Sequence, residues 1–109
     1  MLTTRLYFYQ RLSAMVMAPL VLVHLATMMF AIQGGLDSSE ILSRTQGSIL
    51  WGLFYGLFVV ASAVHAAIGL RVIANEWFKI TGVTLQVLMF AIGISILGLG
   101  GRAVFAVVF

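Results

Sequence analysis

One histidine stands at a depth where an imidazole is unfavourable unless something binds it. His65 lies inside a long apolar stretch, and ionisable residues within membrane spans mark functional sites by default. Histidine is also the commonest metal ligand, and the residues about one helical turn away, Ala61, Ser62 and Gly69, are small enough for a flat ring to lie beside them. Arg71 follows where the helix reaches the membrane surface. This grouping predicts that His65 ligates a haem iron, the alternative being a hydrogen bond to another helix.

The second histidine, His24, lies in the first apolar stretch among bulky neighbours that leave no obvious room for a macrocycle. It is a second candidate haem ligand, with a hydrogen bond to Thr27 or to a partner helix as the alternative. At a rise of about 1.5 Å per residue, His24 lies roughly 20 Å from Arg11 along its helix. His65 lies only about 9 Å from Arg71, so the two histidines are expected at different levels. Two haems, or one haem completed by a histidine of a partner chain, fit this spacing.

Polar and aromatic side chains gather near one end of the first two apolar stretches. Tyr7, Arg11 and Ser13 lie at the start of the first stretch, and Arg71 and Trp77 lie at the end of the second. Such side chains donate hydrogen bonds to the two carbonyls of a quinone headgroup, and a cation stabilises the negative charge formed on reduction. The group therefore predicts a quinone site. The alternative is the belt of aromatic residues and arginines that membrane proteins place at the lipid headgroups.

Composition defines the class of protein that must position these groups. Hydrophobic residues make up 62% of the chain and charged residues 8%, against roughly 25% charged residues in a soluble domain. The chain is therefore predicted to be an integral membrane protein. It has no cysteine, which excludes disulfides and thiolate-held iron–sulfur clusters. Its six lysines and arginines are scattered singly, so no nucleic-acid partner is expected.

The pattern of apolar and polar segments predicts an all-α membrane protein that forms a single domain, residues 1–109. Three transmembrane helices are expected over about residues 8–32, 48–74 and 80–100, because about twenty apolar residues suffice to cross the hydrocarbon. A short interfacial helix is expected over about residues 38–46 in the first loop. Two glycines and an arginine are expected to end the third span, which leaves an apolar tail beyond it.

Small residues and charges indicate how these helices are placed. Ser48, Gly52 and Gly56 form a small-xxx-small ladder, which serves packing within the chain or against partner helices in a larger bundle. The cationic residues beside the spans divide four to two between the two sides of the membrane, which predicts a cytoplasmic N-terminus in the cytoplasmic (inner) membrane. The side with four carries Arg5, Arg11, Arg71 and Lys79, and the side with two carries Arg44 and Arg102.

Two short motifs resemble those of the small cytochrome b membrane-anchor subunits of succinate dehydrogenase and fumarate reductase, the complex II family. Residues 65–71 read His-Ala-Ala-Ile-Gly-Leu-Arg and resemble the family's His-x-x-x-Gly-Ile/Leu-Arg. Residues 10–14 read Gln-Arg-Leu-Ser-Ala and resemble His-Arg-x-Ser/Thr-Gly, with Gln10 in place of the histidine and Ala14 in place of the glycine. Tyr7 stands where the family has a serine.

The resemblance implies a role for each matching residue. His65 would be an axial ligand of haem b, and Arg71 would lie near the haem propionates. Arg11 would belong to a quinone pocket, with Ser13 beside it. His24 occupies the place of a second haem ligand found in one di-haem branch of the family, so one haem or two, shared with a partner subunit, remain open.

The resemblance also implies a non-catalytic subunit of a larger enzyme complex. Such a chain anchors a flavoprotein subunit and an iron–sulfur subunit to the lipid bilayer, beside a second membrane-anchor subunit, and passes electrons to quinone. Two other classes compete with this interpretation: a haem-free structural subunit of a respiratory complex, and a small membrane transporter. A transporter usually carries a buried carboxylate, whereas the three acidic residues of this chain are predicted to lie outside the hydrocarbon.

Overall fold

The computed structural model describes residues 3–109, which form four helices and no strand. The helices are α1 (Thr4–Gln33), α2 (Ser38–Thr45), α3 (Ile49–Phe78) and α4 (Gly82–Val108). The three long helices are each apolar and long enough to cross a membrane. The prediction of an all-α membrane protein with three spans is therefore confirmed.

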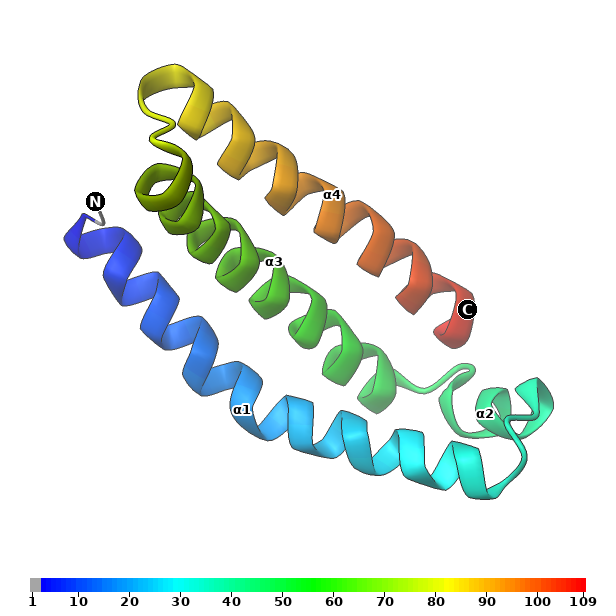
Figure 1. Cartoon of the computed structure of the whole chain (residues 1–109). Coiled ribbons are helices and arrows are strands. Elements are labelled where there is room, and N and C mark those ends of the chain that lie inside the picture. Colours follow the sequence, from blue (N-terminus) through cyan, green and yellow to red (C-terminus); the bar gives the residue numbers. More distant parts are fainter. Residues whose placement is uncertain (1–2) are drawn as a thin grey trace.

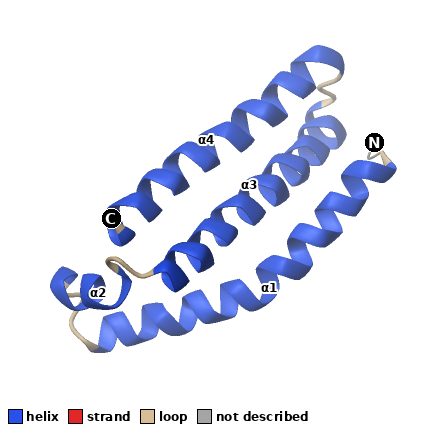
Figure 2. Cartoon of the chain, turned by 180° about the vertical axis from the view of Figure 1, so that it is seen from behind, coloured by secondary structure: helices blue, strands red, loops and turns tan. Residues whose placement is uncertain are grey.

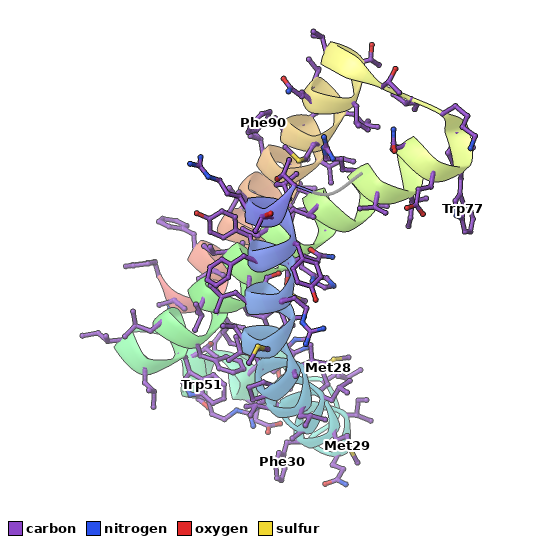
Figure 3. The ribbon with its side chains drawn as sticks, turned by 90° about the vertical axis from the view of Figure 1, so that its left-hand side faces the viewer. Met28, Met29, Phe30, Trp51, Trp77 and Phe90 are labelled. Carbon is purple, nitrogen blue, oxygen red and sulfur yellow. The ribbon has the colours of Figure 1, made fainter. Side chains whose placement is uncertain are left out.

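Helix α3 occupies the middle of the molecule, with α1 on one side and α4 on the other (Figure 1). The N-terminus and the α3–α4 turn lie at one end, and α2 and the C-terminus lie at the other, as the view from behind also shows (Figure 2). Helix α1 bends near its middle, where Pro19 has no N–H to donate to the preceding turn. Seen from the side, α1 crosses the α3–α4 pair rather than running parallel to it (Figure 3).

Short polar side chains begin three of the helices. The hydroxyl of Thr3 accepts a hydrogen bond from the backbone N–H of Leu6 at 3.2 Å, so α1 begins four residues earlier than the apolar pattern predicts. Asp37 caps α2 through the backbone N–H of Ser39, and the Ser48 hydroxyl caps α3. Residues 4–10 thus belong to the first long helix.

The expected end of α4 at the glycine pair is wrong, because the helix continues through Gly100 and Gly101 to Val108. Gly100 is a contact point and not a stop: a Cβ there would lie 2.7 Å from Val59 Cγ1 on α3. The last carbonyls of α4 also find donors outside the helix. The Thr45 hydroxyl donates to the carbonyl of Val107 at 2.8 Å. The carbonyl of Val108 accepts a hydrogen bond from the backbone N–H of Gly47, in the linker between α2 and α3. These bonds satisfy groups that a helix end otherwise leaves open.

The small-residue ladder of α3 packs in part within the chain. A Cβ at Gly52 would lie 3.4 Å from Val108 Cγ1, whereas one at Gly56 would meet nothing within 4 Å. The Gly47 N–H, just before the ladder, donates to the Val108 carbonyl at 2.6 Å. The outer end of α3 therefore meets the C-terminal turn of α4, and the Gly56 position stays open.

Helix α3 contributes more buried residues than any other helix, and most of them are alanine. They are Ala61, Ala63, Ala67, Ile68 and Ala74, each less than a tenth exposed. Most large apolar side chains point outward, including the labelled Met29, Phe30 and Phe90 (Figure 3). Without water, burial of such side chains between helices gains little, so close approach at small residues holds the bundle and the outer faces meet lipid or partner helices.

Replacing Gly100 by alanine is expected to destabilise the α3–α4 contact. Val59 is β-branched and stiff, so it cannot turn away from the added methyl group, and overpacking of this kind costs about 1–3 kcal/mol. Gly98→Ala is the matched control, because a Cβ there meets nothing within 4 Å. Thermal denaturation in detergent should lower the midpoint for Gly100→Ala alone; equal midpoints would contradict the contact.

Replacing Thr45 by valine keeps the shape of the side chain and leaves the Val107 carbonyl without its donor. A buried acceptor left unpaired costs about 1–3 kcal/mol, so the last turn of α4 should open more often. Thr81→Val is the control, because the Thr81 side chain makes no capping hydrogen bond to α4. Hydrogen exchange of the amides at residues 105–108 should accelerate only in Thr45→Val, and unchanged exchange would count against the cap.

Candidate functional site

His65 faces α1 across the interface between α1 and α3. Its Nδ1 atom lies 3.4 Å from the hydroxyl oxygen of Ser13. Ser13 is only 6% exposed, so lipid and water have little access to this contact. The Ser13 hydroxyl also lies 3.0 Å from the backbone carbonyl oxygen of Gln10, one turn earlier in α1, and donates to it. A polar contact inside the apolar bundle therefore joins the two helices at His65.

Gln10 meets the same face of α3 one turn further along. Its Nε2 lies 3.3 Å from the position of a Cβ added at Gly69, so the glycine leaves just enough room for the amide. Its Oε1 is buried and has no hydrogen-bond partner among residues 3–109. Gln10, Ser13, His65 and Gly69 are called the His65 cluster below. The family motif had marked Gln10 only as a departure, although its i, i+3 spacing from Ser13 predicts that both lie on one face of α1.

His24 lies at a different level, as the residue spacing predicts. The rings of Tyr55 and Phe58 on α3 meet its imidazole edge to face, with centroids 6.0 and 5.2 Å away. Phe58 precedes His65 by about two turns, roughly 10 Å along α3. The Thr27 hydroxyl donates to the backbone carbonyl of His24 at 2.7 Å, so it does not give its proton to the ring.

A cavity of about 520 Å³ lies beside His24. Bulky neighbours on α1 predicted no room there, and that expectation does not hold. The space comes from small residues on the other two long helices, Ser62 on α3 and Gly100 and Ala103 on α4. Spacing along a single helix cannot reveal a cavity whose walls are contributed by all four helices.

Tyr7 and Arg11 lie on a different face of α1 from Ser13. The Arg11 guanidinium carbon lies 6.0 Å from the centroid of the Tyr7 ring, and Tyr7 is 55% exposed. The two side chains line an open cavity of about 440 Å³ on the outside of α1. Positions two apart on a helix do not face each other, which explains why Ser13 points inward.

The remaining predicted residues lie near the end of α3. Arg71 is half-buried, and Trp77 is 75% exposed with its side chain projecting away from the bundle (Figure 3). This chain therefore does not bring Tyr7 and Arg11 together with Ser13 and Trp77. A quinone site that uses Tyr7 or Trp77 must be completed by residues of other subunits.

The described residues do not offer a chelating site for a bare metal ion. Within residues 3–109 there is no group of three or more His, Cys, Asp or Glu side chains that could hold one. A haem iron has a different requirement, because the macrocycle supplies four ligands and the protein only the axial ones. A single imidazole such as that of His65 or His24 can meet it.

Comparison with known families agrees with the architecture. The model of the succinate dehydrogenase/fumarate reductase transmembrane subunit family matches residues 1–99. No curated protein and no solved structure matches the chain. The match covers α1, α2, α3 and most of α4, including both histidines and the His65 cluster. The chain therefore belongs to the family of succinate dehydrogenase/fumarate reductase transmembrane subunits, and is a multi-pass membrane-anchor subunit of a complex of that type.

Proposed function

We propose that this subunit binds haem b through His65 and helps to form the quinone site of a succinate:quinone oxidoreductase-type complex. The observation that carries the proposal is the placement of His65, an imidazole held in the apolar bundle by a single long contact at Nδ1. The chain itself would not oxidise or reduce the dicarboxylate. That reaction would belong to a flavoprotein subunit, with an iron–sulfur subunit between it and the membrane.

The His65 cluster has the chemistry that a haem needs. Ser13 occupies one ring nitrogen of His65 and leaves the other without a hydrogen-bond partner among residues 3–109, which suits a haem ligand. The orphaned Oε1 of Gln10 is a buried acceptor that no donor among residues 3–109 satisfies. At Gly69 only a flexible amide fills the space that a larger side chain would take. The cluster is therefore compatible with a macrocycle beside α3.

Within this proposal, His65 would hold the iron and Arg71 would pair with a propionate. A guanidinium forms bidentate hydrogen bonds with a carboxylate, and such pairs are strong where water is scarce. When bound, the haem supplies a carrier for single electrons. The residues around it hold it in place and keep water away from it.

The quinone headgroup would lie at the end of the bundle that carries the start of α1 and the α3–α4 turn (Figure 1). Arg11 is the chief candidate to bind it, because the guanidinium can donate to a carbonyl oxygen and stabilise the negative charge formed there on reduction. Tyr7 holds the guanidinium from one side. Trp77 projects away from the bundle and does not line the cavity of Arg11, so it would contribute to the headgroup site only together with residues of other subunits. We assign this end to the cytoplasmic side of the inner membrane, where the iron–sulfur and flavoprotein subunits would dock.

A second haem is a further candidate, favoured by the cavity of about 520 Å³ beside His24. It would lie roughly two turns of α3 away from His65, on the side of α2. His24 would hold it from this chain, and a second membrane-anchor subunit would supply any further histidine, because His65, the other histidine here, lies at a different level. The complex would contain two haems if His24 is a ligand, and one haem if it is not.

Replacing His65 by alanine is expected to remove haem b from the complex while the subunits still assemble. The measurement is a reduced-minus-oxidised difference spectrum of the purified complex, with pigment counted per flavin. His24→Phe is the matched variant, since phenylalanine can keep the edge-to-face contacts with Tyr55 and Phe58. Full pigment in His24→Phe indicates one haem, and half indicates two. An unchanged spectrum in His65→Ala would refute ligation by His65.

Replacing Arg11 by glutamine is expected to raise the KM for quinone about 10- to 100-fold, because a charged hydrogen bond contributes about 1.5–3 kcal/mol. The measurement is quinone-dependent turnover of the complex, with dicarboxylate at saturation. Arg5→Gln is the control, because Arg5 is also exposed near the start of α1 but lies outside the cavity that Arg11 lines. Equal KM values for the two variants would rule out a quinone contact at Arg11.

A further inference from the structure

We propose that Ser13 is a positioning residue that fixes the tautomer of His65, so that Nε2 is the ring nitrogen left free to bind iron. This inference rests on the proposed haem site and gives Ser13 a role there in place of one in the quinone pocket. It follows from the two contacts of a single hydroxyl group, at Gln10 and at His65.

The first step is to place the hydroxyl proton of Ser13. The hydroxyl has one proton to donate and two lone pairs to accept with. Its oxygen lies 3.0 Å from the carbonyl oxygen of Gln10 and 3.4 Å from Nδ1 of His65. The shorter contact is the better hydrogen bond, and a carbonyl oxygen can act only as an acceptor. The proton therefore points at Gln10.

The second step concerns the ring of His65. With its proton directed at Gln10, the Ser13 oxygen can offer His65 only a lone pair. Nδ1 must then carry the hydrogen and donate to that oxygen, because two lone pairs facing each other would repel. A neutral imidazole has only one N–H, so Nε2 carries the lone pair. That lone pair is what an iron atom needs.

The burial of Ser13 makes its oxygen the main acceptor available to Nδ1–H of His65. Ser13 is 6% exposed, so water is poorly placed to replace it as the acceptor for Nδ1–H. Metal-bound histidines commonly donate their second ring N–H to a fixed oxygen, which sets the tautomer and the ring orientation. Ser13 has the position and the lone pair for that task.

The same geometry separates Ser13 from the proposed quinone contacts. Arg11 and Tyr7 line the outer cavity of α1, and Ser13 is absent from that lining. Ser13 instead shares its face of α1 with Gln10, whose side chain packs at Gly69. One face of α1 thus serves His65, and another serves the outer cavity.

The direct test is nitrogen NMR of the full-length chain in detergent micelles, with ¹⁵N-labelled histidine. The chain has two histidines, and His24→Phe assigns the two sets of ring signals. We expect His65 to show the Nδ1–H form in the wild type and a mixture with the Nε2–H form in Ser13→Ala. Ser13→Thr keeps the hydroxyl and should restore the Nδ1–H form. A His65 tautomer that does not change in Ser13→Ala would overturn the inference.

A second measurement uses the assembled complex. Loss of an outer partner of a metal-bound histidine typically costs about 10- to 100-fold in metal affinity, so Ser13→Ala should retain haem more weakly and shift its midpoint potential. Ser13→Thr should reverse both effects, which a general packing defect would not allow. If Ser13→Ala instead raises the KM for quinone and leaves haem retention and the midpoint potential unchanged, the inference is contradicted and Ser13 belongs to the quinone pocket. If the proposed haem ligation by His65 is itself wrong, the result is different: the complex keeps its haem absorbance in His65→Ala.

Discussion

The hydrocarbon interior offers no hydrogen-bond partner, and the rest of the structure depends on that constraint. Every polar group placed there must find its partner within the protein. His65 finds the Ser13 hydroxyl, and the end of α4 finds donors in Thr45 and Gly47. These contacts also decide how the helices meet, because each joins elements that are distant in sequence. The contact of His65 with Ser13 and the cap at the end of α4 thus follow from the same requirement.

Helix α3 carries the site because both other long helices pack against it. Its buried face is built mostly of alanines, and a Cβ at Gly93 on α4 would lie only 3.5 Å from the Cβ of Ala67. Close approach at small residues leaves the large apolar side chains on the outside, where lipid and the other subunits of the complex can cover them. His65 on this helix contacts α1, and His24 on α1 contacts α3 at another level, so the proposed haem site at His65 is separate from the cavity beside His24.

The three spans and the family were predicted because apolar length and short motifs are local properties of a sequence. The end of α4 was not predicted, because a pair of glycines is typical of a helix end. In the structure Gly100 instead allows α4 to pack closely against Val59. The room beside His24 was also missed, because residues of all four helices supply its walls. The sequence could have predicted that Ser13 and Arg11 lie on different faces of α1, because residues two apart on a helix point in different directions. What the sequence could not show is the contact between Ser13 and His65 across two helices.

The most direct test of the account is pulsed electron paramagnetic resonance of the oxidised complex, with ¹⁵N-histidine incorporated in this chain alone. If His65 holds the iron, the haem signal will show hyperfine coupling to a labelled nitrogen of this subunit, in wild type and in His24→Phe alike. A complex that contains haem but shows no coupling to any labelled nitrogen would contradict the account, because the iron would then be held entirely by other chains.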